Sequence, residues 1–258
     1  MSMGPLMAES FSIKSEVLDE EREICIHLPE GHMESGEIYP VVYLLDGQRL
    51  FNVASSLVEY YSNSSRIPPL IVVGIASTDR RRDFAPTMRG ADDGKPPSGG
   101  GADNFLRFMA EELYPEIESK YPTRDYRVLI GHSLGGLFAV HAFVARPEMF
   151  RAYMALSPWF GPEDDALLTK VESYLKKGVS PPKLLFAAHE PIKRKDTERR
   201  IGVFISLLRE NEQEELDWEY KLYEDADHMN LPIKAIPDGL DFFFPGIVQD
   251  RATPARSY

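Results

Sequence analysis

The sequence has little cysteine, no long apolar run and no basic start. Its single cysteine among 258 residues, Cys25, excludes an intramolecular disulfide and any metal site built from several thiolates. No stretch approaches the roughly 18 consecutive apolar residues of a membrane span, and the N-terminal sequence MSMGPLMAESFS lacks the basic and apolar regions of a secretory signal. By default these absences predict a cytoplasmic protein, although a secreted chain already trimmed of its signal would look the same.

The sequence also has fewer basic than acidic residues. Lys and Arg number 29 against 41 Asp and Glu, so the formal net charge is −12 at pH 7. A protein that binds nucleic acid needs a basic face to contact phosphates, and an anionic membrane attracts basic rather than acidic segments. The sequence therefore predicts neither a nucleic-acid nor a membrane partner, and it leaves the oligomeric state open.

The length and the hydropathy pattern indicate a single α/β domain over residues 1–258. A hydrophobic content of 43% and a charged content of 27% are typical of a soluble globular protein. Short apolar runs alternate with segments of helical periodicity, which predicts a mostly parallel sheet of about eight strands with helices on both faces. An antiparallel hairpin is expected at 9–17 and 22–28. The later strands are predicted at 39–47, 69–77, 126–130, 150–158, 182–191 and 217–228, and the helices at 48–61, 102–121, 134–146, 163–177, 195–210 and 231–242.

The longest irregular stretch is TDRRRDFAPTMRGADDGKPPSGGG, residues 78–101. A loop of this length within a compact domain is usually an active-site loop or a mobile lid. A disordered surface excursion is an equal alternative for its glycine-rich second half.

The segment VLIGHSLGG, residues 128–136, places a serine where an apolar strand must become a helix. This is the strand–turn–helix context of a G-x-S-x-G nucleophile elbow, in which a strained corner exposes the hydroxyl of Ser133. Strand and helix come so close that glycine is expected at both 131 and 135. The amide of Leu134, at the start of the helix, would then stabilise an oxyanion. The alternative is a glycine-rich turn whose serine only caps the helix.

A serine hydroxyl needs a neighbouring base, and in this type of fold the chain order is serine, acid, histidine. His228 follows the last predicted strand, where a loop can return its imidazole to Ser133, and it is the predicted base. The alternative base is His189, with Asp164 or Asp165 as its acid.

With His228 as the base, the acid is expected after the penultimate strand, KLLFAA. Glu190 directly follows this strand and is the predicted acid. Asp196 is the alternative, although an Asp at the start of a helix is commonly just a cap. A site without an acid, a Ser–His dyad, also remains open.

The remaining site predictions concern the oxyanion hole and the substrate. The amide of Gln48, in the turn after the 39–47 strand, would be the second oxyanion donor. An apolar acyl or aryl pocket is expected from Trp159, Phe160 and Phe84. Arg82, within the run of three arginines at 80–82, is a candidate contact for an anionic substrate group. No metal or cofactor is expected, because the His-Glu pair at 189–190 has no second histidine at the spacing of a zinc site.

Several stretches together carry a resemblance to a known family: YPVVYLLDG, LIVVGIASTDRRRDFAPT and the run from FMAEELYPEIESKYP to IGHSLGGLFAVHAFVARPEMFRAYMALSP. They resemble an esterase family of the α/β-hydrolase superfamily that includes enterobactin (siderophore) esterases, S-formylglutathione hydrolase and feruloyl esterases. The resemblance covers about residues 11–230. It implies the α/β-hydrolase fold, Ser133 as nucleophile, His228 as base, and the amides of Gln48 and Leu134 as oxyanion hole.

The sequence differs from the pattern of these relatives at two places. It has SPWFG at 157–161 where many relatives have SPSLWW, and AAHE where relatives tend to have Gly-x-x-Glu after the penultimate strand. Some siderophore esterases among these relatives have a catalytic serine and histidine without an acid.

Together these patterns predict a metal-free serine hydrolase that cleaves carboxylic esters through an acyl-enzyme. Its expected partner is a small-molecule ester, for example a siderophore lactone, an aryl ester or a short acyl ester. The alternatives are an acyltransferase that uses the same residues and a non-catalytic binding module that retains the fold.

Overall fold

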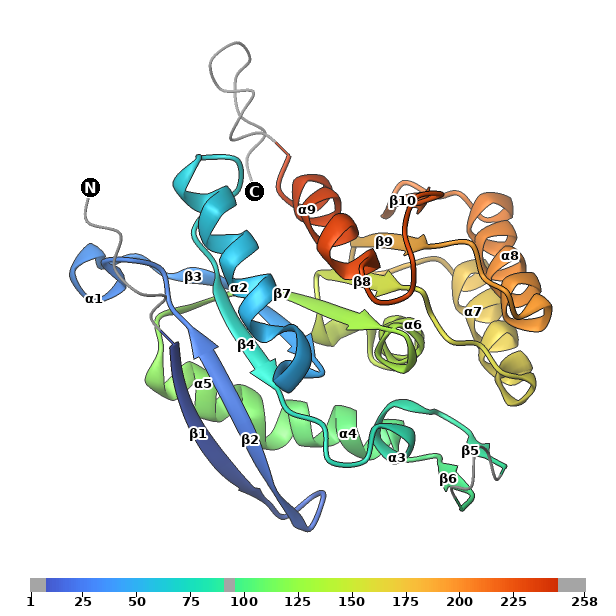
Figure 1. Ribbon diagram of the computed structural model, residues 1–258, viewed down its shortest axis with the longest axis horizontal. Coiled ribbons are helices and arrows are strands. Elements are labelled where there is room, and N and C mark those ends of the chain that lie inside the picture. Colours follow the sequence, from blue (N-terminus) through green and yellow to red (C-terminus); the bar gives the residue numbers. More distant parts are fainter. Residues whose placement is uncertain (1–7, 91–95, 246–258) are drawn as a thin grey trace.

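A computed structural model describes the protein over residues 8–90 and 96–245. The chain is built on one large twisted sheet (Figure 1). The sheet has eight strands in the order β1-β2-β4-β3-β7-β8-β9-β10. β1 pairs antiparallel with β2 and β2 antiparallel with β4, and all other pairs are parallel. This confirms the predicted fold class. The strands are β1 (Ala8–Ser15), β2 (Glu20–His27), β3 (Tyr39–Leu45), β4 (Ile71–Ile75), β7 (Thr123–His132), β8 (Ala152–Leu156), β9 (Lys183–His189) and β10 (Leu216–Leu222).

Helices cover both faces of the sheet and bury two apolar cores (Figure 1). Side chains of α2 and α9 pack on one face, and those of α4 to α8 pack on the other. Successive residues of a strand point to opposite faces of the sheet and so pack into different cores. On β3, Val42 and Leu44 belong to one core, and Val41 and Tyr43 belong to the other. The helices are α1 (His32–Ser35), α2 (Gly47–Asn63), α3 (Arg80–Phe84), α4 (Ala102–Phe108), α5 (Tyr114–Lys120), α6 (Leu134–Ala145), α7 (Asp165–Lys177), α8 (Lys195–Glu210) and α9 (Leu231–Phe243).

Several predicted elements differ in extent from the observed ones, among them the strands predicted at 150–158 and 217–228. β8 ends at Leu156 and β10 at Leu222, so the residues that follow them lie on loops rather than on strands. The predicted helix 102–121 is interrupted by a π-helical turn at Met109–Leu113. Pro115, two residues after this turn, has no N–H to donate within the helix, and a wider turn accommodates its ring.

The stretch 78–101 is more regular than its composition predicts. It contains α3 and a small two-stranded sheet formed by β5 (Met88–Arg89) and β6 (Ser98–Gly99). Asp79 caps α3 by accepting hydrogen bonds from the amides of Arg81 and Arg82. Residues 91–95 lie outside the described residues, and a lid function for this stretch stays a prediction.

No helix in 8–90 or 96–245 combines the length and the apolar composition that crossing a bilayer requires.

A buried ion pair anchors α3 to the sheet. The guanidinium of Arg22 on β2 lies 2.9 Å from a carboxylate oxygen of Asp83 on α3, and it also donates to the carbonyl of Ala76. Both side chains of the pair are almost completely excluded from solvent. Breaking a pair of this kind leaves an uncompensated charge in the interior.

We expect Asp83→Ala to lower the free energy of unfolding by about 3 kcal/mol, because the buried Arg22 would lose its buried counter-ion and keep only Glu20, whose side chain is 20% exposed. The matched control is Asp241→Ala, which breaks an ion pair with Arg66 whose side chains are 51% and 26% exposed. The control should cost about 1 kcal/mol or less. Urea unfolding measures both values, and similar losses for the two variants would contradict the role of Arg22 and Asp83.

Candidate active site

Ser133 occupies the corner between β7 and α6 in a conformation that side chains rarely adopt. Its φ is 62° and its ψ is −117°. The corner is held by its backbone, because the amide of Ser133 donates to Leu156 O on β8. A Cβ built on Gly131 would lie 2.0 Å from the carbonyl oxygen of Gly135, so only glycine fits at position 131. The predicted elbow geometry is therefore present.

A second position near the corner also has no room for a side chain, and it is Gly136 rather than the predicted Gly135. A Cβ on Gly135 would meet nothing closer than 3.4 Å, which is ordinary van der Waals contact. A Cβ on Gly136 would lie 2.6 Å from Leu156 O. The prediction that position 135 itself excludes a side chain is therefore wrong. α6 touches β7 through the backbone of Gly135 and touches β8 through Gly136.

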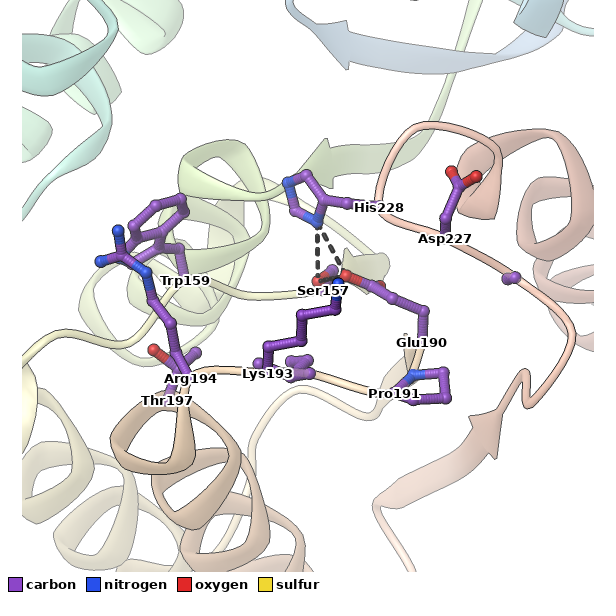
Figure 2. Close-up of a pocket in the computed structure, with 11 residues that line it drawn as sticks. Ser157, Trp159, Glu190, Pro191, Lys193, Arg194, Thr197, Asp227 and His228 are labelled. Carbon is purple, nitrogen blue, oxygen red and sulfur yellow. Dashed lines mark hydrogen bonds and ion pairs between the residues drawn. The ribbon is translucent and has the colours of Figure 1, made fainter.

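A polar cluster forms at the carboxyl edge of the sheet from residues on three loops (Figure 2). Glu190, after β9, places Oε1 2.8 Å from Nδ1 of His228, on the loop between β10 and α9. Ser157, after β8, donates from Oγ to the same Oε1 at 3.1 Å and lies 3.3 Å from Nδ1. Glu190 is buried, whereas the side chain of His228 is 41% exposed. One carboxylate oxygen thus orients both the imidazole and the serine hydroxyl.

The charge of Glu190 is maintained by these contacts. Burial, the largest single contribution, raises the pKa of the carboxyl group, but the hydrogen bond from His228, a backbone hydrogen bond and the charge of His228 together outweigh it and hold the pKa below its usual value. Ser157 contributes in the same direction. Glu190 is therefore ionised at neutral pH, and its negative charge faces Nδ1 of His228.

His132, next to Ser133 in the chain, packs against the imidazole of His228. The two ring centroids are 4.5 Å apart at an interplanar angle of 40°. Burial, with a smaller contribution from His228, lowers the pKa of His132 to about 3. His132 is thus an uncharged ring at neutral pH and forms one wall beside His228.

The predicted contact between Ser133 and His228 is not made directly. Within the described residues, no hydrogen bond links Ser133 Oγ to the imidazole, and the pairing of nucleophile and base stays a prediction. The backbone of Ser133 is instead bonded to the loop after β8, since the amide of Trp159 donates to Ser133 O at 3.1 Å.

The two predicted oxyanion donors lie at the starts of helices. Leu134 is the first residue of α6, and Gln48 follows Gly47 at the start of α2. The side chain of Gln48 is tied to the backbone of Ser77 by two hydrogen bonds, which fixes the turn after β3. Asp46 stabilises the same turn through Arg80, with Nε and Oδ1 2.5 Å apart.

The alternative base and acids are engaged elsewhere. Both ring nitrogens of His189 are hydrogen-bonded, Nδ1 to Glu190 O and Nε2 to the Tyr220 hydroxyl. Asp164 is paired with Arg89, and Asp165 with Arg200.

Asp196 is an exposed residue in the first turn of α8, whose N-cap is Arg194. It therefore does not cap the helix, contrary to the simplest interpretation of its position.

A pocket of about 430 Å³ extends from the polar cluster along the loop between β9 and α8; we call it the β9–α8 pocket. Ser157, Glu190 and His228 line one part of it, and Trp159, Lys193 and Arg194 line another (Figure 2). The predicted substrate contact by Trp159 is thus compatible with its position.

The other three predicted substrate contacts do not lie in this pocket. Phe84 is buried against Phe105 and Phe138, because α3 packs on α4 and α6. Phe160 is fully buried as well, against Phe204 of α8. Both belong to the hydrophobic core, and their assignment to the pocket is corrected.

Arg82 has its own counter-ions. Its guanidinium pairs with Asp83 at 2.7 Å and with Glu20 at 2.8 Å. The prediction of an anion contact at Arg82 is corrected, because these carboxylates already neutralise it.

No group of three or more His, Cys, Asp or Glu side chains that could hold a metal ion occurs among the described residues. Sequence reasoning missed two residues of the cluster, Ser157 and His132. Ser157 could have been noticed because it follows a strand adjacent to the one that precedes Glu190. The stacking of His132 had no signal in the sequence, since it depends on the path of a loop from a distant strand.

The sheet order and the nucleophile-elbow corner define a protein of the α/β-hydrolase fold. The chain belongs to the family described as “Putative esterase”, which matches residues 15–207. Several of its curated relatives carry esterase names, and the chain is a hydrolase of the carboxylesterase type.

Two curated relatives are named for siderophore substrates. The ferri-bacillibactin esterase BesA of Bacillus subtilis is 32% identical over 197 residues, covering 67% of this chain and 68% of that enzyme. The siderophore enterobactin esterase of Emericella nidulans is 33% identical over 179 residues, covering 62% of this chain and 57% of that enzyme. Among solved structures, an IroE-like serine hydrolase from Shewanella oneidensis superimposes with a TM-score of 0.87 at 34% identity, covering 92% of this chain and 80% of that one.

The neutral state of His132 predicts a pH dependence of stability. In the unfolded chain this imidazole titrates near its ordinary pKa of 6.5, and in the folded protein near 3. Below pH 6.5 the unfolded state therefore binds more protons, and the free energy of unfolding falls with decreasing pH. Between pH 7 and pH 5 His132 accounts for a loss of about 2 kcal/mol.

The variant His132→Gln should lose about 2 kcal/mol less than the wild type over this interval, as measured by urea unfolding at each pH. Between pH 7.5 and 8.5, where neither state protonates the ring, the two proteins should change in parallel. An equal loss from pH 7 to pH 5 in both proteins would show that His132 titrates normally in the fold.

Proposed function

We propose that the protein hydrolyses carboxylic esters through an acyl-enzyme, with Ser133 as nucleophile, His228 as general base and Glu190 as the acid that orients His228. The observation that carries this proposal is the 2.8 Å contact between Glu190 Oε1 and His228 Nδ1. It directs the other ring nitrogen, Nε2, away from the carboxylate, and it lies at the sheet edge where the elbow presents Ser133.

In this mechanism Ser133 Oγ attacks the ester carbonyl carbon while Nε2 of His228 accepts the hydroxyl proton. The carbonyl oxygen becomes an oxyanion, which the backbone amides of Gln48 and Leu134 stabilise by hydrogen bonds. When the tetrahedral intermediate collapses, the C–O bond to the alcohol breaks and the imidazolium returns its proton to the leaving oxygen. A water molecule, deprotonated by the same imidazole, then releases the carboxylic acid and regenerates Ser133.

Electrostatics supports the role of His228 in each half of this cycle. The proton taken from the nucleophile creates an imidazolium, and the ionised Glu190 stabilises that charge. His132 is uncharged at neutral pH, so it adds no repulsion to the imidazolium that it contacts.

The names of the relatives favour an ester of the siderophore class as the substrate. The indole ring of Trp159 in the pocket wall is compatible with an aryl group next to the scissile bond. We therefore propose siderophore-type aryl esters, rather than long aliphatic esters, as the compounds to test first.

The nucleophile is tested with Ser133→Ala. We expect kcat/KM for p-nitrophenyl butyrate to fall by at least about 10³-fold, because the triad acts as a unit. A fluorophosphonate probe should label the wild type and not the variant. The far-ultraviolet circular dichroism spectrum should be unchanged. Activity within tenfold of the wild type would overturn the assignment of Ser133.

The acid is tested by comparing Glu190→Gln with Asp196→Asn. Both changes replace a carboxylate with its amide, but only Glu190 contacts His228. We expect Glu190→Gln to lower kcat by about 10²-fold or more, since the imidazolium loses its stabilising charge. Asp196→Asn should leave kcat within twofold of the wild type. If both variants keep wild-type kcat, the site works as a Ser–His dyad without an acid.

A further inference from the structure

The β9–α8 pocket carries positive charge in a chain whose formal net charge is −12. Lys193 and Arg194 both lie on the loop between β9 and α8, and both are exposed and line the pocket. Figure 2 shows their side chains projecting from this loop on the side where Trp159 and Ser157 lie. A net negative protein repels anionic ligands at a distance, so local cations are required wherever such a ligand binds.

Neither cation is neutralised by a carboxylate within the described part of the chain. The ion pairs of this region are Glu190 with His228 and Asp165 with Arg200, and neither includes Lys193 or Arg194. The arginines at 80–82 differ in this respect. Two of them pair with carboxylates, Arg80 with Asp46 and Arg82 with Asp83, and Arg81 donates to a backbone carbonyl.

The carboxylates that line the pocket have other partners. Glu190 accepts from His228 and Ser157. Asp227 accepts hydrogen bonds from the backbone amides of Met229 and Asn230 at the start of the loop toward α9. The donor groups of Lys193 and Arg194 therefore remain available to a ligand.

The guanidinium of Arg194 is positioned by an aromatic ring. Its central carbon lies 4.8 Å from the centroid of Trp159, so the cation is held at the pocket wall. A guanidinium held over a ring keeps its N–H groups at the edge, where they can bind a carboxylate in a bidentate manner. The wall itself is anchored, because the hydroxyl of Thr197 on α8 donates to Phe160 O next to Trp159.

We propose that Lys193 and Arg194 form a subsite for a negatively charged group of the substrate, such as a carboxylate, so that the enzyme prefers anionic esters over neutral ones of the same size. This inference rests on the proposed function, because the subsite begins beside His228 and Glu190. The charged group can belong to the acyl part or to the alcohol part of the ester, and the experiment has one arm for each.

The experiment measures the ratio of kcat/KM for an anionic ester to that for a neutral ester of similar size. The acyl arm compares mono-p-nitrophenyl glutarate with p-nitrophenyl butyrate. The alcohol arm compares 4-(butyryloxy)benzoate with 4-(butyryloxy)benzamide. The proteins are the wild type, Lys193→Gln, Arg194→Gln and, as a matched control, Lys195→Gln. The control removes the same charge from the next residue, which does not line the pocket.

We expect the ratio to fall by about twofold to fivefold in Lys193→Gln and in Arg194→Gln, in at least one arm, as for exposed ion pairs. The arm that responds identifies the part of the substrate that carries the charge. Raising the salt concentration should reduce the ratio in the wild type more than in the variants. In Lys195→Gln the ratio should stay within 1.5-fold of the wild type, on the order of the scatter of such measurements.

Unchanged ratios in both arms for Lys193→Gln and Arg194→Gln would overturn the subsite, as would an equal fall in Lys195→Gln. Failure of the proposed function has a different signature, the absence of any Ser133-dependent turnover of the neutral esters. In that case calorimetric binding of mono-p-nitrophenyl glutarate and of p-nitrophenyl butyrate to Ser133→Ala decides the subsite. Preferential binding of the anionic ester that is lost in Ser133→Ala combined with Arg194→Gln supports it, and equal binding overturns it.

Discussion

The close approach of two backbone segments at the elbow is the constraint on which the rest of the site depends. Gly131 on β7 and the carbonyl of Gly135 on α6 leave no room for a Cβ between them. At this contact Ser133 has a positive φ, and it lies largely buried at the carboxyl edge of the sheet. The same corner is bonded to β8 through Leu156 O and to the amide of Trp159, so the elbow also sets the position of the pocket wall.

Around this corner, a few hydrogen bonds stabilise the charged side chains. A buried carboxylate is costly unless it is hydrogen-bonded, and Glu190 receives donors from both Ser157 and His228 on a single oxygen. Next to this pair, His132 is kept neutral by burial. Farther along the β9–α8 pocket, Lys193 and Arg194 supply the positive charge that the sequence reasoning had sought at Arg82. The net negative charge of the protein thus acts on an anionic ligand at long range. The positive charge of the pocket acts on the same ligand once it is in contact with Lys193 and Arg194.

Much of the fold was predictable because strand and helix patterns are local. Buried parallel strands appear as apolar runs, and α2, α7 and α8 have the periodicity of one buried face. The carboxyl ends of neighbouring strands meet at one edge, so the residues after β9 and β10 could be expected near Ser133, and Glu190 and His228 do meet there. The type of a side chain does not reveal its burial, however. Phe84, Phe160 and Trp159 are all aromatic and close to functional segments, and only Trp159 lies at the pocket.

The sequence by itself determined the fold class and the elbow, and it indicated that Glu190 and His228 follow neighbouring strands, because these depend on residue type and on short-range spacing. The tertiary structure decided which charges are free and which aromatic rings are accessible. Arg82 is neutralised by Glu20, which is distant in the sequence, while Arg194 has no such partner among the described residues and stacks on Trp159. The physical reason is that a side chain's partners come from segments that only the packing of helices on the sheet brings together, and electrostatic interactions act through space rather than along the chain.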